Sequence, residues 1–161
     1  MPKPMPETVF DDLTAFVAVV GRGRPLVGLD LGTKTIGVAL SDVEWRIATA
    51  SRVIKRRKFS QDAAELQEFC EEQGACGLVL GLPLNMDGTE GPRAQSTRQF
   101  ARNLAGFFAL PIVFWDERLS TVAAERAMID ADISRKKRAA RIDAAAAAYI
   151  LQGVLDRIKH L

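Results

Sequence analysis

The sequence contains very little histidine and cysteine, which excludes several kinds of catalytic and metal site. The single histidine, His160, is the next-to-last of 161 residues. Serine-histidine and cysteine-histidine catalysis, and metal sites built from histidines, are therefore excluded. The two cysteines, Cys70 and Cys76, lack metal-type spacing. We expect them to be small residues in a protein of a reducing compartment.

Long apolar runs are also missing, because no run reaches the length that spans a membrane. The N-terminus lacks a basic region followed by an apolar block, so we expect a cytoplasmic protein. The formal net charge is only +2, which identifies no partner by itself. A chain of 161 residues is long enough for one domain with a proper core.

The stretch from Leu26 to Asp42, LVGLDLGTKTIGVALSD, predicts a β-hairpin with one acid in its first strand. Apolar and small residues alternate with strand period on both sides of the Gly-Thr-Lys turn. Asp30 would thus lie near the end of a strand that is otherwise core. Because a lone buried carboxylate is costly, we predict a cation beside Asp30 in preference to a role in capping the turn.

The rest of the chain predicts an α/β domain. Strands are expected at 47–54, 77–82 and 111–115, and helices at 59–73, 94–108, 121–129 and 142–158. A strand, a helix and a second buried strand indicate a parallel crossover. Residues 1–24 are expected to form an extension that is partly disordered or contains a short helix. Residues 25–161 would form the domain.

Two further acids occupy positions like that of Asp30. Glu117 follows the strand expected at 111–115, on the side of Trp115. Asp143 begins a stripe that continues through Ala147 and Ile150, so it would face the core. A helix dipole favours an acid in the first turn, but it does not explain an inward direction. Three oxygen ligands without histidine suit Mg²⁺ or Mn²⁺, and two such ions with substrate bound can cleave a phosphodiester.

Basic residues are concentrated next to these acids. Arg135 to Arg138, followed by Arg141, form the densest basic cluster, and no acid lies between Asp132 and Asp143. Such a cluster can hold a polyanionic substrate. The loop 83–92 either binds phosphate or only forms turns, and the run Lys55 to Lys58 is either a solvated turn or a phosphate contact. The candidate substrate-binding residues are Lys34, Asn85, Arg118, Arg135, Lys136, Lys137, Arg138 and Arg141.

Four blocks of this sequence resemble the signature blocks of the bacterial YqgF/RuvX family: LDLGTKTIGVALSD, GLPLNMDGTEG, DERLSTVAA and RIDAAAAAYIL. The resemblance spans about Leu26 to Leu155. It implies a ribonuclease H-like fold, with a five-stranded mixed sheet of three antiparallel and then parallel strands, flanked by helices. The positions before Asp143 often include lysine in this family; here they read AARI.

The resemblance also implies a function. A member of this family is expected to be a metal-dependent nuclease that processes the 5′ end of precursor 16S ribosomal RNA, or a Holliday junction resolvase acting on branched DNA. Asp30, Glu117 and Asp143 would be the catalytic acids that bind Mg²⁺ or Mn²⁺. The partners would be structured RNA or branched DNA and ribosomal precursor particles, with no membrane, and the protein would act as a monomer or a homodimer.

Two other classes of protein remain open on the sequence. Residues 30–34, DLGTK, also resemble the first phosphate loop of actin-like ATPases and sugar kinases. Those proteins need a second domain and a second Gly-rich loop, which this chain lacks. A non-catalytic RNA-binding module would explain the basic clusters but not three converging acids, since carboxylates repel phosphates unless a metal intervenes.

Overall fold

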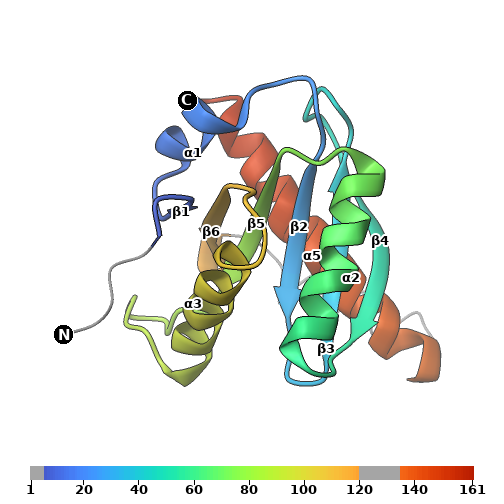
Figure 1. The fold of residues 1–161 in the computed structure, drawn as a ribbon. Helices are drawn as coiled ribbons and strands as arrows, with labels where there is room; N and C mark the ends of the chain where they lie inside the picture. Colours follow the sequence, from blue (N-terminus) through green and yellow to red (C-terminus); the bar gives the residue numbers. More distant parts are fainter. Residues whose placement is uncertain (1–5, 120–134) are drawn as a thin grey trace.

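A mixed β-sheet with helices on both faces forms the protein (Figure 1). The computed structural model describes residues 6–119 and 135–161, and the side chains of all of these except 135–143. The sheet has six strands in the order β1-β6-β5-β2-β3-β4. The strands are β1 (Val9–Phe10), β2 (Leu26–Leu31), β3 (Thr35–Ser41), β4 (Ala48–Lys55), β5 (Gly77–Leu82) and β6 (Ile112–Asp116).

The direction of each strand follows from the length of its connection. Short turns join β2 to β3 and β3 to β4, and both pairs are antiparallel. The strands β2, β5 and β6 are parallel neighbours, and the connections between them contain helices. The central strand β5, GLVLGL, is buried at every position, as a strand covered on both faces requires.

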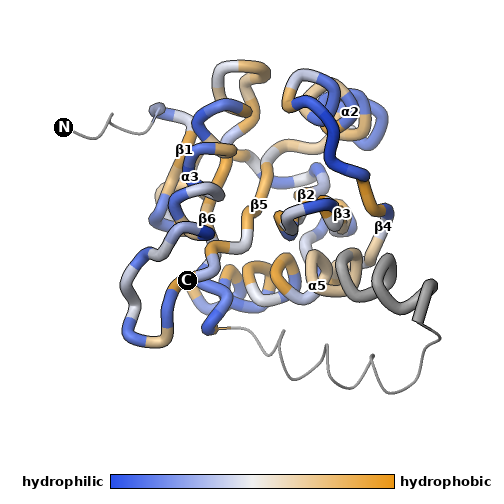
Figure 2. Tube along the Cα trace, turned by 90° about the horizontal axis from the view of Figure 1, so that it is seen from below, coloured by the Kyte–Doolittle hydropathy of each residue, from blue (hydrophilic) through white to orange (hydrophobic). Residues whose placement is uncertain are grey.

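The helices form two layers around this sheet. Figure 2 shows α5 (Arg135–Ile158) along one face and α2 (Phe59–Gln73) and α3 (Pro92–Ala105) on the other side. Local sequence sets their ends: Gly74 ends α2 in the left-handed conformation with φ 68°, and Pro92 begins α3. The other helices of the described residues are the short α1 (Leu13–Val20) and the 3₁₀ turn η1 (Glu117–Leu119).

The side chains of each strand divide between two cores. Leu29, Leu80 and Phe114 belong to the core under α2 and α3. Val79, Val113 and Trp115 belong to the core under α5. This alternation means that Gly28 and Asp30, which share one face of β2, are on the side of α5.

The predicted α/β class and mixed sheet are confirmed, but the number of strands was wrong. The sixth strand, β1, pairs parallel with β6 through Val9 and Ile112. Two residues are too few to show strand period, and Phe10 also fitted the helical spacing that continues through Phe16. In the structure α1 begins only at Leu13, where Asp12 caps it by accepting bonds from the amides of Thr14 and Ala15.

The start of the last helix was also placed wrongly. It begins at Arg135, not at Ile142, so the basic cluster forms its first turns instead of preceding it. Asp143 therefore lies in the third turn, beyond the reach of a first-turn dipole effect. The residues 135–141 carry no apolar stripe, which hid the helix, although Arg, Lys and Ala are good helix formers. The helix expected after Ser120 lies outside the described residues.

No helix in the described part of the chain is long and apolar enough to cross a membrane.

Gly28 sets how closely α5 approaches the sheet, and replacing it tests this packing. A β-carbon at Gly28 would lie 2.7 Å from Leu151 Cβ and 3.0 Å from the carbonyl oxygen of Ala147. Neither atom can move without moving the helix. We expect Gly28→Ala to lower the free energy of unfolding by about 1–3 kcal/mol in a urea titration.

Gly106→Ala is the matched control, because the nearest atom to its new β-carbon would be 3.6 Å away. If Gly28→Ala proved as stable as Gly106→Ala, α5 would not be packed against β2 as tightly as described.

Candidate active site

Asp30 is the buried acid at the end of β2. Asp30 is only 5% exposed, and its backbone pairs with that of Gly37 in β3. The side chain points to the face that α5 covers, as the alternation along β2 requires. The sequence placed Asp30 at the end of a core strand, and the structure has it there.

Glu117 lies on the same face of the sheet, but it follows a different strand, β6. It begins η1, directly after β6. Its Oε1 atom lies 2.6 Å from where a β-carbon of Gly81 would be, and Ile150 of α5 contacts the same point. The carboxylate of Glu117 therefore occupies the space that Gly81 leaves free on the α5 side of β5.

Gly81 is the position that brings the two acids together. The parallel register of β2 and β5 ends at the pair Leu29 and Leu80, and the next two residues are Asp30 and Gly81. Neighbouring strands are about 4.8 Å apart, so Gly81 lies beside Asp30. The carboxylate of Glu117 lies over Gly81. Sequence reasoning missed Gly81, although it lies in the GLPLN motif between two apolar residues.

Asp143 approaches from the helix. Ala147 lies over Gly28, and Gln152, further along α5, accepts a hydrogen bond of 2.8 Å from the amide of Ala48 at the start of β4. The helix thus runs antiparallel to β2, and the position of Asp143, one turn before Ala147, lies toward the end of β2. The side chain of Asp143 is outside the described residues.

The acids present fit a hard divalent cation. Carboxylate oxygens are the ligands that Mg²⁺ and Mn²⁺ prefer, and two carboxylates on the same face of the sheet favour a cation between them. Among the side chains that the structure describes, no group of three metal-binding residues is complete. Asp30 and Glu117 supply two possible ligands, and Asp143 would have to supply the third.

Hydrogen bonds of its own polar side chains fix the conformation of the loop 83–91, which lies beside these acids. Thr89 donates to Asp87 through its amide, at 3.0 Å, and through its hydroxyl, at 2.6 Å. Asn85 donates to the hydroxyl oxygen of Thr89 at 2.9 Å. These bonds lower the pKa of Asp87, with the bond from the Thr89 side chain as the largest cause. The three residues therefore make a turn, and a contact of this loop with phosphate stays a prediction.

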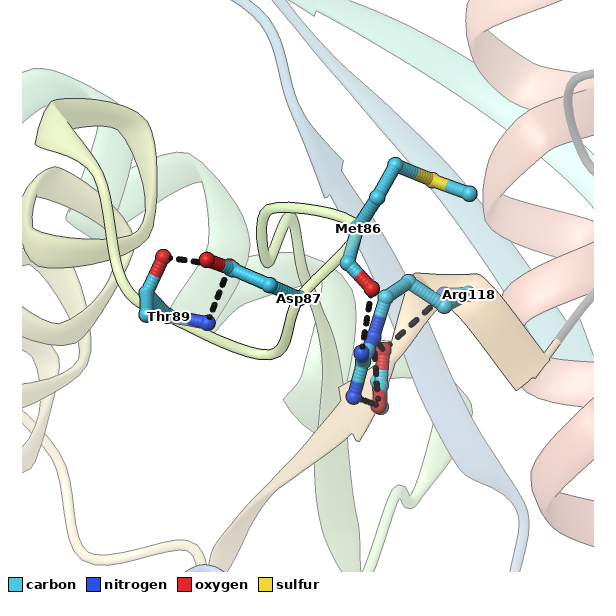
Figure 3. A network of polar contacts seen from close by, with 5 residues as sticks. Met86, Asp87, Thr89 and Arg118 are labelled. Atoms are coloured by element: carbon cyan, nitrogen blue, oxygen red, sulfur yellow. Dashed lines mark hydrogen bonds and ion pairs between the residues drawn. The ribbon is translucent and has the colours of Figure 1, made fainter.

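Arg118 ties this loop to the end of β6 (Figure 3). It donates to both carboxylate oxygens of Asp116 and, at 3.1 Å, to the carbonyl oxygen of Met86. Its hydrogen bond holds the pKa of Asp116 below the usual range, and Asp116 in turn raises the pKa of Arg118. Because Glu117 lies between these two residues, the ion pair holds the backbone that carries the Glu117 side chain. Sequence reasoning missed Asp116.

The other candidate substrate residues are less closely grouped. Lys34 is exposed in the turn between β2 and β3, beyond the end of β2. The backbone of the basic cluster begins α5, at the same end of the sheet. The side chains of Arg135, Lys136, Lys137, Arg138 and Arg141 lie outside the described residues.

The chain matches a known family over most of its length. The RuvX family model, described as "Holliday junction resolvase", matches residues 24–157. A protein of Cereibacter sphaeroides (strain ATCC 17025 / ATH 2.4.3) is 61% identical over 153 residues, which cover 95% of this chain and 96% of the relative. A protein of Rhodobacter capsulatus is 63% identical over 146 residues, covering 91% and 92%. Both relatives bear the name "Putative pre-16S rRNA nuclease".

Solved structures share the fold. RuvC of Thermus thermophilus, in complex with a Holliday junction substrate, superposes with a TM-score of 0.54 and 14% sequence identity, covering 84% of this chain and 96% of RuvC. At that identity the likeness shows a common fold alone. The family model and the two relatives, by contrast, cover nearly the whole chain, and on that ground the chain belongs to the RuvX family.

Proposed function

We propose that the protein is a metal-dependent nuclease that hydrolyses phosphodiester bonds at the site of Asp30, Glu117 and Asp143. The observation that supports this proposal is that the Glu117 carboxylate lies over Gly81, on the α5 side of the sheet, beside the strand position of the buried Asp30. The position of Asp143 in α5 lies toward the same end. Nothing in a purely structural role requires acids from three separate elements to converge.

The chain's own residues would hold the ion and fix the geometry. Mg²⁺ or Mn²⁺, when bound by these acids, would supply an activated water and offset charge on the leaving oxygen. Asp30 is held rigidly because its strand is paired on both sides. Glu117 is oriented by the ion pair of Asp116 and Arg118 and by the space over Gly81.

The proposed substrate is the precursor of 16S ribosomal RNA, cleaved at its 5′ end in the cytoplasm, within ribosomal precursor particles. The relatives that are 61% and 63% identical over nearly the whole chain bear the name of that activity. Lys34, Asn85, Arg118 and the basic first turns of α5 would contact the substrate. Resolution of Holliday junctions is the second candidate, because the matching family model carries that description.

Removing the acids one at a time tests the catalytic site. Asp30→Asn, Glu117→Gln and Asp143→Asn each remove an anionic ligand at nearly constant volume. Each should lower cleavage by more than about 100-fold, because even the outer partners of metal ligands contribute 10- to 100-fold. The measurement is cleavage of labelled precursor RNA and of a four-way DNA junction, side by side with Mg²⁺, Mn²⁺ or a chelator.

Asp156→Asn is the matched control, since Asp156 is an exposed acid near the other end of α5. Cleavage by all three variants at the rate of the control would show that the acids are structural. Cleavage of the junction without cleavage of the RNA would favour the second candidate.

Gly81 gives an independent test through the position of Glu117. A β-carbon there would lie 2.6 Å from Glu117 Oε1 and 2.5 Å from Ile150 Cδ1, both of them ends of flexible side chains. We expect Gly81→Ala to fold but to displace the carboxylate, lowering kcat by about 100-fold, as a misplacement of about 1 Å does. Activity should fall much less in Gly106→Ala. An unchanged kcat in a folded Gly81→Ala protein would show that Glu117 has no part in the reaction.

A further inference from the structure

A small notch lies beyond the end of β2, between the β2–β3 turn and the first turns of α3. Its volume is about 60 Å³. Its walls combine two arginines, three hydroxyl side chains and the turn, namely Leu31, Gly32, Thr33, Arg56, Arg93, Ser96 and Thr97. The notch lies toward the α2 and α3 side of the sheet, because Arg56 lies against Phe100 of α3. It is therefore separate from the face that carries Asp30 and Glu117.

Arg56 is held in a fixed position in this notch. Its Nη1 atom donates to the carbonyl oxygen of Gly32 at 2.7 Å. Its guanidinium carbon lies 5.6 Å from the ring centre of Phe100, as in a cation-π contact. Its backbone amide also donates to the carbonyl oxygen of Lys34, at 2.9 Å. A guanidinium has five N–H donors, so most of those of Arg56 are left for a ligand.

Arg93 enters the notch from the other side. It lies in the first turn of α3 and donates to the carbonyl oxygen of Leu31 at 3.4 Å. Leu31 and Gly32, whose carbonyl oxygens hold the two arginines, are consecutive in the chain. The guanidinium of Arg93, from α3, and that of Arg56, from the segment after β4, thus bind neighbouring carbonyl groups of the same backbone.

The charge of these two arginines is not neutralised within the described part of the chain. Several other arginines there form ion pairs with acids, for example Arg57 with Glu65 and Arg118 with Asp116, whereas others, such as Arg52, do not. No described carboxylate forms an ion pair with Arg56 or Arg93. Two neighbouring cations without such a partner favour an anionic ligand.

The size of the notch limits what this anion can be. A volume of about 60 Å³ is about twice the share of one water molecule in the liquid. A space of this size suits a small anion such as one phosphate group. The hydroxyls of Thr33 and Ser96 add donors of the kind that contact phosphate oxygens.

The notch is also close to the acids. Gly32 is two residues beyond Asp30, and two residues of extended chain span at most about 7 Å. We propose that Arg56 and Arg93 bind a backbone phosphate of the nucleic-acid strand, on the opposite side of β2 from Asp30 and Glu117. The strand would thus cross the end of the sheet with one phosphate in the notch and another at the acids. The placement of the second phosphate at the acids rests on the proposed function; the phosphate site at Arg56 and Arg93 does not.

Binding without cleavage tests the site directly. The probe is a short, fluorescently labelled single-stranded RNA, titrated in chelator at several salt concentrations and followed by anisotropy. We expect Arg56→Gln and Arg93→Gln each to weaken binding by about 10-fold, the effect of one hydrogen bond to a charged group. Each should also make the slope of log affinity against log salt shallower by about 0.7. Arg93→Lys should keep the slope but not the full affinity, because lysine keeps the charge and loses the planar fork.

Arg157→Gln is the matched control, since Arg157 is exposed in the last turn of α5, away from the notch. It should leave both affinity and slope nearly unchanged. Thermal melting checks the fold of Arg56→Gln, whose side chain packs on Phe100. The exposed Arg93 tests the site even if that variant unfolds.

Three outcomes overturn or support the proposal. Equal affinity and parallel salt lines for Arg93→Gln and Arg157→Gln would overturn it. Binding of inorganic phosphate that depends on both arginines, with RNA binding unaffected, would make the notch a site for the free anion and would also overturn it. Arginine-dependent RNA binding by a protein that cleaves neither substrate would support the notch and refute the proposed nuclease function.

Discussion

The close contact between α5 and β2 is the constraint on which the rest of this structure depends. Gly28 lets the backbone of the helix lie directly on the strand, where any side chain would hold it away. The distance between helix and sheet then decides whether an acid on α5 can share a ligand with one on β2. Gly153 allows a second such approach, with Trp115 Nε1 3.0 Å from its missing β-carbon. The geometry of the acids is thus a result of core packing.

The two sides of β2 carry opposite charge at the same end of the strand. Asp30 and Glu117 lie on the side of α5, and Arg56 and Arg93 lie toward α2 and α3. Such an arrangement suits a polyanion that carries metal ions on part of its length. The arginines attract the bare phosphates, whereas the acids tolerate a phosphate only together with a cation. The distribution of these charges therefore indicates how a nucleic-acid strand would be oriented across the β-sheet.

Much of the fold was readable from local patterns, and the site only in part. Strand period placed Asp30 correctly, because the larger residues Val27 and Leu29 on one face alternate in LVGLDL with Gly28 and Asp30 on the other. Arg56 lies in the run Lys55 to Lys58, for which a phosphate contact was one of the two interpretations. Gly81 and the pairing of Arg56 with Arg93 could not be found, since they depend on register between strands and on residues 37 positions apart in the chain. The start of α5 was missed because residues 135–141 carry no apolar stripe. The short strand β1 was missed because pairing with β6, not local propensity, makes it a strand.

The pairing of β1 with β6 has a consequence for the order of folding. Val9 meets Ile112, a partner 103 residues further along the chain, so this pair can form only once β6 is available. Closing so long a loop costs entropy that only late contacts offset. Until then β6 is an open edge able to pair with a second chain. The segment that carries β1 thus covers that edge of the sheet.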